Sequence, residues 1–488
     1  MTGPDDEHAR ASSVTGRFQQ LAGSELFSPV QWRRRVLFWG GAVLVGLAAI
    51  GFAQAADWAF NVFHGVVTRN RLWAFLITPV TFALLAWLTE GALRPTRGSG
   101  IPQAIAALKV EDEGFRQGLL SLRVAIGKMA LTLAALLGGA SVGREGPTVH
   151  VGAGLLYTLG RRFGFDEPAA AGRFILAGSA AGLAAAFNTP LAGIVFAIEE
   201  MSGSFEHRMS GILLTAVFIA GLVSLGMLGN YAYFGHFNIG LPLGEAWWAV
   251  LATGIVCGLA GGLFARLILP SDTGFRGVIG RLRARQPVVF AAACGLALVL
   301  LSQLTNTGLY GTGYAQAKGI LEGHSDIVTS FGVLKFLGNV ASYWAGIPGG
   351  IFSPALAVGA GLGNNLSAIL PGVDPSAVAL LAMAAYLSGV TQAPLTATVI
   401  TMELTDNQQM VLPIMATCLI ARAASSLFSR QPVYRALADK LIRGYELELA
   451  RRAAEAVPED NDGQVLIEDP ATPPLPTDTA SPTDQRPS

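Results

Sequence analysis

GREGPTVHVGAGL at residues 143–155 and GIFSPALAVGAGL at residues 350–362 are two copies of one pattern, 207 positions apart (350 − 143). Both copies carry glycine and proline near the start, and both end in VGAGL. Further along, TPLAGIVFAIEE at 189–200 has a weaker counterpart in APLTATVITMEL at 393–404. Duplicated apolar halves that Gly and Pro interrupt at corresponding places are typical of a transporter whose binding site lies between the repeats, at mid-membrane.

The composition indicates a membrane protein. The chain has 488 residues, of which 52% are hydrophobic and 14% charged, and its mean hydropathy is +0.48. That charged fraction is far below the roughly 25% of soluble proteins. About 20 apolar residues cross the hydrocarbon core, and the clearest candidates are 36–54, 72–88, 211–229 and 246–265. Shorter apolar pieces broken by Gly or Pro predict helices that enter the membrane without crossing it.

The charges predict that both ends lie in the cytoplasm. The first ten residues, MTGPDDEHAR, are polar and acidic, so we expect no secretory signal before the first span. Arginines at 33–35 abut that span, and five basic residues between 435 and 452 follow the last one. By the positive-inside rule, this predicts cytoplasmic termini and an even number of crossings.

These features predict one membrane domain with polar ends. From about residue 458 the chain is rich in Pro, Asp and Thr, which predicts disorder and no further folded domain. We expect a cytoplasmic N-terminal segment at 1–30, a transmembrane domain at 31–445 with repeats at about 31–235 and 240–430, and a cytoplasmic, largely disordered tail at 446–488.

Cysteine, histidine and net charge point to no metal, cofactor or nucleic acid. Cys257, Cys294 and Cys418 lie in apolar stretches without paired spacing, so we expect them to pack in the core. The six histidines are scattered, which argues against a metal cluster. The formal net charge is zero and gives no reason to expect nucleic-acid binding.

The segment GREGP at 143–147 places a carboxylate at the start of a helix at membrane depth. Free N–H groups and the helix dipole favour an anion there, and ionised Glu145 can itself be that anion. A bound anion would compete with the Glu145 carboxylate for this helix end. Protonation of Glu145 would remove its charge and leave the helix end free for the anion, so Glu145 could act as both gate and proton carrier. The alternative is a structural capping glutamate paired with Arg144.

Two glycine-rich segments have the same design without a charge. GSGIP at 98–102 allows close backbone approach and offers the Ser99 hydroxyl. GGIFSP at 349–354 places Phe352 where the first copy has Glu145, so the N–H groups of Ile351 and Phe352 could face an anion without a competing carboxylate. The alternative for each segment is a turn that only permits helix packing.

Two adjacent carboxylates, Glu199 and Glu200, end the apolar run after Pro190. They face different directions on a helix, so we expect only one to point into the protein. Glu199 has the counterpart Glu403, which predicts a shared structural role, whereas Glu200 aligns with Leu404 and occurs only in the first half. Glu200 is therefore the better candidate for a proton relay, with a solvated helix end as the alternative.

Together these segments resemble the CLC family of chloride channels and proton/chloride exchangers. GSGIP, GREGP and GGIFSP resemble its three anion-site signatures in the same order, with PVY at 432–434, and the likeness runs from about residue 32 to 442. The resemblance implies an all-α polytopic membrane protein of two inverted repeats with many tilted and broken helices. It also implies a homodimer with one pore per subunit, in the bacterial inner membrane.

The resemblance further implies residue roles. Ser99 and Tyr434 would offer hydroxyls to a central chloride, and the N–H groups of Ile351 and Phe352 would complete the site. Glu145 would be the external gate and proton glutamate, and Glu200 the internal proton-transfer glutamate. The supporting residues implied are Gly98, Gly100, Gly146 and the buried lysine Lys128.

The chain also departs from the family. The common GSGIPE reads GSGIPQ here, and Gln103 should be peripheral. The paired nucleotide-sensing domains of many relatives do not follow the membrane part, so we expect no adenine-nucleotide regulation.

The leading hypothesis is a secondary active antiporter that exchanges chloride for protons. The nearest alternative is a passive, voltage- or pH-gated chloride channel of the same fold, and Glu200 together with Glu145 and Tyr434 favours the antiporter. A membrane-embedded enzyme is the alternative from another class, but no HExxH, GxSxG or CxxC motif occurs.

Overall fold

In the computed structural model, the described residues form helices joined by short loops, and no strand occurs among them. The only described extended pairings are the isolated bridges Gly98–Pro348 and Gly143–Gly350. The predicted all-α class is thus confirmed for the described part of the chain. That part is residues 29–455 apart from 166, 203–210, 230, 242–243, 245–246, 270–276, 306–307, 325–326 and 371.

The two halves of the chain contain corresponding series of helices. In the first half these are α2 (Pro29–Arg69), α3 (Trp73–Glu90), η2 (Arg94–Thr96), α4 (Ile101–Lys109), α5 (Glu113–Leu120), α6 (Leu122–Leu137), α7 (Glu145–Arg162), α8 (Pro168–Phe187), α9 (Pro190–Phe196), the π-helical turn η3 (Ala197–Ser202) and α10 (Gly211–Leu228). In the second half they are α11 (Trp247–Ile268), α13 (Gly277–Arg285), α14 (Pro287–Ser302), α15 (Tyr314–Leu321), α16 (Phe331–Trp344), α17 (Phe352–Ser367), α18 (Pro375–Thr391), α19 (Pro394–Thr405), α20 (Val411–Ser425) and α21 (Val433–Glu455).

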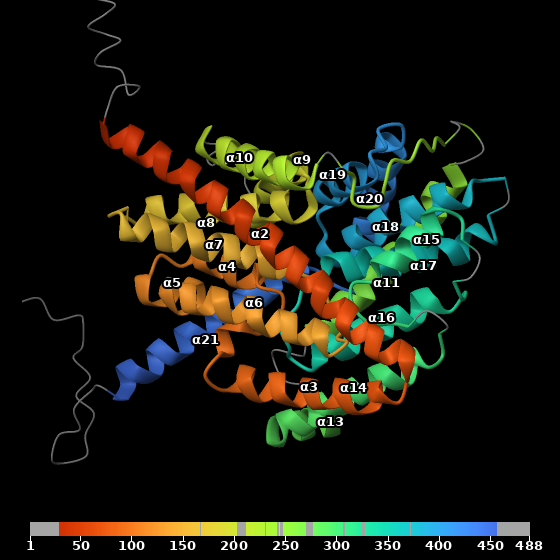
Figure 1. The fold of residues 1–488 in the computed structure, drawn as a ribbon, viewed down its shortest axis with the longest axis horizontal. Coiled ribbons are helices and arrows are strands. Elements are labelled where there is room, and N and C mark those ends of the chain that lie inside the picture. Colours follow the sequence, from red (N-terminus) through yellow and green to blue (C-terminus); the bar gives the residue numbers. More distant parts are fainter. Residues whose placement is uncertain are drawn as a thin grey trace, which may run out of the picture. The chain divides into compact units, whose positions relative to one another are not determined.

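The helices α6 to α10 recur as α16 to α20. The closely packed pair α7 and α8 has its counterpart in α17 and α18, and the two series gather on opposite sides of Figure 1, in orange to yellow and in cyan to blue. At their junction, Gly143 and Gly350 exchange reciprocal backbone hydrogen bonds of 2.7 and 2.6 Å in an antiparallel bridge. Because these residues occupy equivalent positions in the two copies, the halves meet in inverted orientation.

Among the described residues, five helical segments are long and apolar enough to cross a membrane, as judged by length and composition. The predicted span 36–54 falls within one of them. The spans 72–88 and 246–265 each begin one residue before another, and residue 246 lies outside the described residues. The span 211–229 overlaps α10, whose apolar part is shorter. α2 has 41 residues, about twice what a perpendicular crossing needs. A helix of this length fits a bilayer by tilting.

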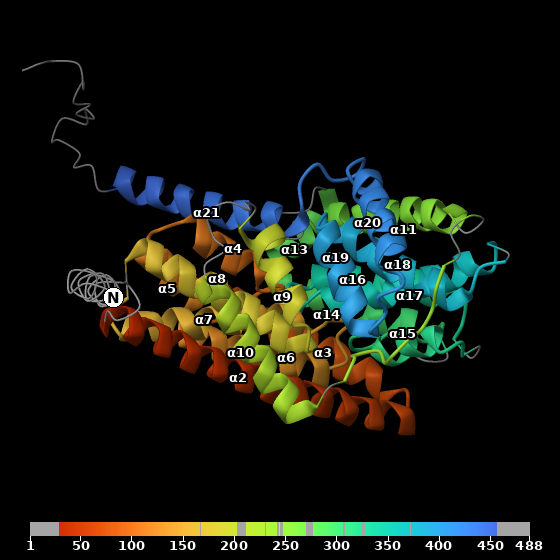
Figure 2. The same cartoon turned by 90° about the horizontal axis from the view of Figure 1, so that it is seen from above.

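Two short helices, α9 and α19, join the halves through crossed carboxylate caps. The Glu403 carboxylate accepts hydrogen bonds from the N–H groups of Leu191 and Ala192 at the start of α9, the shorter at 2.7 Å. In the same way, Glu199 accepts from the start of α19, at 3.2 and 2.7 Å. Figures 1 and 2 both show α9 beside α19. Each half thus satisfies the free N–H groups of the other half's broken helix.

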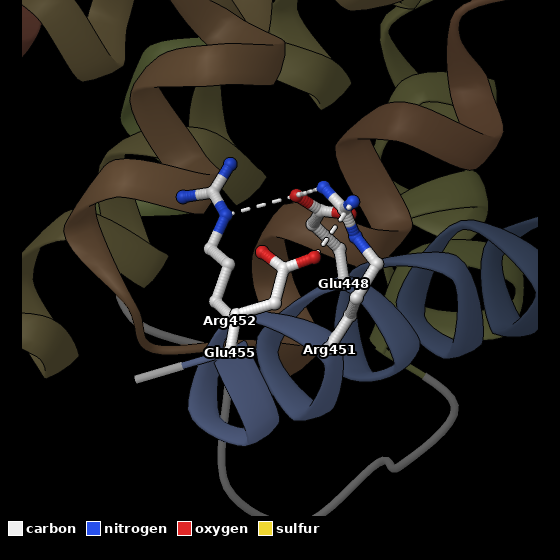
Figure 3. Close-up of polar contacts among 4 residues, drawn as sticks. All are labelled: Glu448, Arg451, Arg452 and Glu455. Atoms are coloured by element: carbon white, nitrogen blue, oxygen red, sulfur yellow. Dashed lines mark hydrogen bonds and ion pairs between the residues drawn. The ribbon is translucent and has the colours of Figure 1, made fainter. Parts of the chain in front are cut away.

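The C-terminal helix α21 extends into the stretch that was expected to be the tail. Contacts divide the chain into the units Met1–Ile442 and Arg443–Ser488, and residues 446–455 of the second unit are helical. Figure 3 shows why: Glu448 pairs with Arg451 at 3.1 Å and with Arg452 at 2.9 Å, and Arg451 also pairs with Glu455. Such neighbours three and four apart stabilise a helix. The rest of the predicted tail lies outside the described residues.

The ion pairs in this helix also affect the acidity of Glu448. Hydrogen bonds from Arg451 and Arg452 lower the pKa of the Glu448 carboxyl from 4.5 to about 2. The pKa of Glu448 is lower in the helix than in the unfolded chain. The ion pairs therefore stabilise the helix fully at pH values above 4.5, and this stabilisation is lost as the pH falls to about 2.

Glycine lets the paired helices of each half touch through their backbones. A Cβ at Gly152 of α7 would lie 2.2 Å from the Gly178 carbonyl oxygen of α8. We therefore expect Gly152→Ala to force the two helices apart and to lower the free energy of unfolding by about 1–3 kcal/mol, as overpacking usually does. Thermal unfolding of the purified protein in detergent measures this loss.

Gly51→Ala is the matched control. Nothing lies within 4 Å of a Cβ at Gly51 of α2, and alanine is the better helix former. Equal melting temperatures for the Gly152 and Gly51 variants would contradict the close-packing account.

Candidate anion and proton site

The structure brings the three glycine-rich segments and the PVY segment together. The Gly98–Pro348 and Gly143–Gly350 bridges join the loops that precede α4, α7 and α17. Tyr434, in the first turn of α21, stacks its ring on Phe352 with centroids 5.9 Å apart and planes 18° apart. Helix N-termini from both halves therefore converge, and such ends are anion-binding sites because their first N–H groups have no intrahelical partner.

Close approach here depends on glycine. A Cβ at Gly146 would lie 2.3 Å from the Ser99 hydroxyl, so no other residue leaves room for Ser99 at this place. Gly100 caps α4 in the left-handed region with φ +103°, which L side chains rarely adopt. The predicted supporting positions thus let the GSGIP loop and α7 meet.

Two hydroxyls face the point of convergence without a protein partner. The Ser99 hydroxyl and the Tyr434 phenol are buried and lie near each other. Among the described residues, neither atom has a hydrogen-bond partner. Since a buried polar atom without a partner is costly, both atoms fit contact with a small ligand. Ile351 and Phe352 begin α17 beside them, and their N–H groups fit the same anion.

Glu145 is fully buried at the start of α7. The Ser353 hydroxyl donates to its Oε1 at 2.5 Å, and Oε2 has no partner in the described structure. Arg144 turns away: its guanidinium pairs with Asp57 at 2.6 Å and donates to the Ala53 carbonyl. The alternative in which Arg144 neutralises Glu145 is therefore not the arrangement found.

Glu199 and Glu200 do point in different directions. Glu199 caps α19, which agrees with the structural role that it shares with Glu403. Glu200 is only 2% exposed, and its Oε1 has no hydrogen-bond partner among the described residues. It lies on the π-helical turn η3, a local structure that often occurs at functional sites. Glu200 is thus a buried carboxylate and not a solvated helix end.

Aromatic rings surround the start of α17. Phe352 is buried and contacts Phe187 and Phe196 edge to face at 6.5 and 6.1 Å, besides stacking on Tyr434. An apolar surround strengthens the few polar contacts that an ion makes inside it.

Lys128 binds the backbone at the start of the GSGIP loop. Its buried ammonium donates to the carbonyls of Thr96 and Gly98 at 2.6 and 2.8 Å. Gln103, the residue that departs from the family pattern, donates to the carbonyl of Arg97 at 2.7 Å. Both side chains therefore fix the backbone of the loop at and just before Gly98.

The sequence analysis missed a second buried lysine. Lys335 of α16 donates to the Ser141 hydroxyl and to the carbonyls of Leu309 and Gly311, at 2.7 to 2.9 Å. It follows Lys128 by 207 positions (335 − 128), so the repeat offset could have revealed it. In the described structure, neither ammonium is paired with a carboxylate. Each half thus places one buried lysine beside a glycine-containing loop of that half.

A cavity of about 590 Å³ lies next to Glu145. Its lining includes the Asp57–Arg144 pair and Tyr233. The Tyr233 phenol interacts with Ser353, whose hydroxyl donates to Glu145. Two hydroxyl side chains that no sequence pattern singled out, those of Tyr233 and Ser353, therefore lie between the cavity and the Glu145 carboxylate.

The comparisons with known proteins agree with this geometry. The family model described as voltage gated chloride channel matches residues 81–426. The chain is 29% identical over 445 residues to the H(+)/Cl(-) exchange transporter ClcA of Citrobacter koseri, covering 86% of this chain and 90% of that protein. It is 30% identical over 453 residues to ClcA of Salmonella paratyphi A, covering 87% and 93%.

Solved structures show the same fold. A slow cyanobacterial Cl⁻/H⁺ antiporter superposes with a TM-score of 0.69 at 24% identity, over 86% of this chain and 98% of that one. A CLC-type fluoride/proton antiporter superposes with a TM-score of 0.70 at 24% identity, over 84% and 99%. The predicted fold of two inverted repeats is confirmed, and the chain belongs to the voltage-gated chloride channel family, the CLC family.

Proposed function

We propose that this protein is a secondary active antiporter that exchanges chloride for protons. The observation that carries the proposal is a pair of buried carboxylates, Glu145 and Glu200, which both act electrostatically on the Tyr434 phenol. Each has an oxygen without a hydrogen-bond partner in the described structure. Ionisable groups inside a membrane protein are costly and usually serve transport. The relatives named as exchange transporters support the same function.

The anion path would use hydroxyl and backbone donors. Ser99, Tyr434 and the N–H groups of Ile351 and Phe352 would replace part of the hydration shell of chloride. A hydrogen bond to a charged group contributes about 1.5–3 kcal/mol, so a few donors can hold the ion without trapping it. Lys128 would add positive charge behind the site.

The proton path would run through the two carboxylates. Ionised Glu145 would compete with chloride for the helix end, and protonation would remove that competition. Glu200 would pass protons between Glu145 and the cytoplasm. The passive channel is the second candidate, and it is less favoured because it gives no task to the buried Glu200, whose Oε1 has no hydrogen-bond partner among the described residues.

We further propose that the protein acts as a homodimer in the bacterial inner membrane, with both termini in the cytoplasm and the transmembrane domain at 31–445. The helices α9 and α19 are too short to cross a bilayer. Helix ends at membrane depth have free backbone groups, so other protein segments must cover them. Around these helices, large apolar side chains are exposed on α9, α10 and α20: Leu191, Phe218, Leu222, Leu412 and Leu419. A second copy would cover this face.

Purified protein in chloride-loaded liposomes tests the antiport directly. An imposed chloride gradient should drive protons uphill, because the two ions share one obligatory cycle. The measurement is the external pH together with the chloride released. Chloride release without any proton movement in the wild type would favour the channel and overturn the proposal.

Glu145→Gln tests the gate. The amide mimics a permanently protonated carboxyl, so chloride flux should persist while proton movement is lost. Both fluxes are measured in the same liposome assay, and circular dichroism checks that the variant is folded. If Glu145→Gln pumped protons at the wild-type ratio, Glu145 would not be the gate.

Glu200→Gln tests the inner proton carrier. We expect uphill proton movement to be abolished while chloride still crosses, because Glu200 would touch protons only. Glu199→Gln is the matched control, since its carboxylate caps α19, and we expect it to lower thermal stability and to retain coupling. The reverse pattern, with coupling lost in Glu199→Gln and kept in Glu200→Gln, would show that the wrong carboxylate was chosen.

A further inference from the structure

Arg435 connects the helix turn that carries Tyr434 with the helix turn that carries Glu200. It directly follows Tyr434 in the first turn of α21. Its guanidinium donates to the Glu199 carbonyl at 2.8 Å, and Glu199 directly precedes Glu200. The residue that follows Tyr434 is thus hydrogen-bonded to the residue that precedes Glu200.

The accepting carbonyl lies in the last described turn of a helix, since residues 203–210 lie outside the described residues. α9 continues into η3, which ends at Ser202. The last carbonyls of a helix have no intrahelical partner, and a cation placed there is favourable with the helix dipole. Arg435 therefore caps from α21 the turn that carries Glu200.

Arg435 also acts on Glu200 by its charge. The charged groups that influence the Glu200 carboxylate are Arg435 and Glu199. The negative charge of Glu199 is held at the start of α19 by two N–H groups. The Tyr434 phenol is the remaining titratable neighbour. Arg435 is therefore the group in this set that favours ionised Glu200.

We propose that Arg435 is a positioning residue that keeps the proton-carrying turn η3 in register with the anion-binding Tyr434. A shift of the first turn of α21, for example when chloride leaves the Tyr434 phenol, is transmitted through Arg435 to the turn of Glu200. This role rests on the proposed antiport. It predicts that Arg435 governs the ratio of protons to chloride more than the chloride flux.

A plain anchoring role for Arg435 makes a different prediction. α21 has another attachment in the same unit, the ion pair between Lys109 of α4 and Asp439 at 2.7 Å. Lys109 does not appear among the charges that act on Glu200. Lys109→Gln therefore removes a different contact of α21 and leaves the contact with η3 in place, which makes it the control for a general loosening of α21.

The test measures proton and chloride fluxes in liposomes for the wild type, Arg435→Gln, Arg435→Lys and Lys109→Gln. Arg435→Gln should lower the proton-to-chloride ratio by about two- to fivefold, the range set by a cation at a helix C-terminus, and should retain chloride flux. Lys109→Gln should keep the wild-type ratio.

Arg435→Lys keeps the charge but loses the guanidinium fork, so its ratio should lie between those of the wild type and Arg435→Gln. A wild-type ratio in Arg435→Lys would contradict the positioning role, and this result decides the question if Arg435→Gln does not assemble. An equal loss in Lys109→Gln would show that Arg435 is only an anchor. A wild type that moves no protons would instead overturn the antiport itself.

Discussion

The reciprocal hydrogen bonds between Gly143 and Gly350 are the constraint on which the site depends. They join equivalent residues of two inverted halves directly before α7 and α17. Because these helices begin there, their free N–H groups are brought to one place inside the protein. Glycine is needed, since the loops approach within van der Waals contact of each other. The proposed anion site would therefore be built by both halves and belong to neither half alone.

The two halves then differ where the chemistry requires it. The first copy carries Glu145 and the second carries Phe352, so one helix end holds a titratable charge and the other holds a ring beside bare N–H groups. The crossed caps of Glu199 and Glu403 keep the symmetry, and Glu200 breaks it. Structural tasks are thus shared by both halves, whereas the proposed proton path uses groups of the first half only.

Much of this could be predicted from the sequence because the pattern is local. The glycine-rich motifs, the apolar spans and the repeat offset place Ser99, Glu145 and Phe352 without any structure. Contacts between distant segments could not be predicted, such as Arg435 with the Glu199 carbonyl, since a backbone acceptor leaves no sequence signal. Residues 446–455 are helical although they were assigned to the tail, because a polar, charged composition resembles that of a tail. The helix is indicated only by opposite charges three and four residues apart.

The central claim is that chloride binds where the helix ends of the two halves meet. Bromide is an anion of similar size with anomalous scattering, so crystals of the protein grown in bromide test this claim most directly. The account predicts an anomalous peak within hydrogen-bond reach of the Ser99 hydroxyl, the Tyr434 phenol and the N–H groups of Ile351 and Phe352. Well-diffracting crystals with bromide bound elsewhere, and no peak at this place, would contradict it.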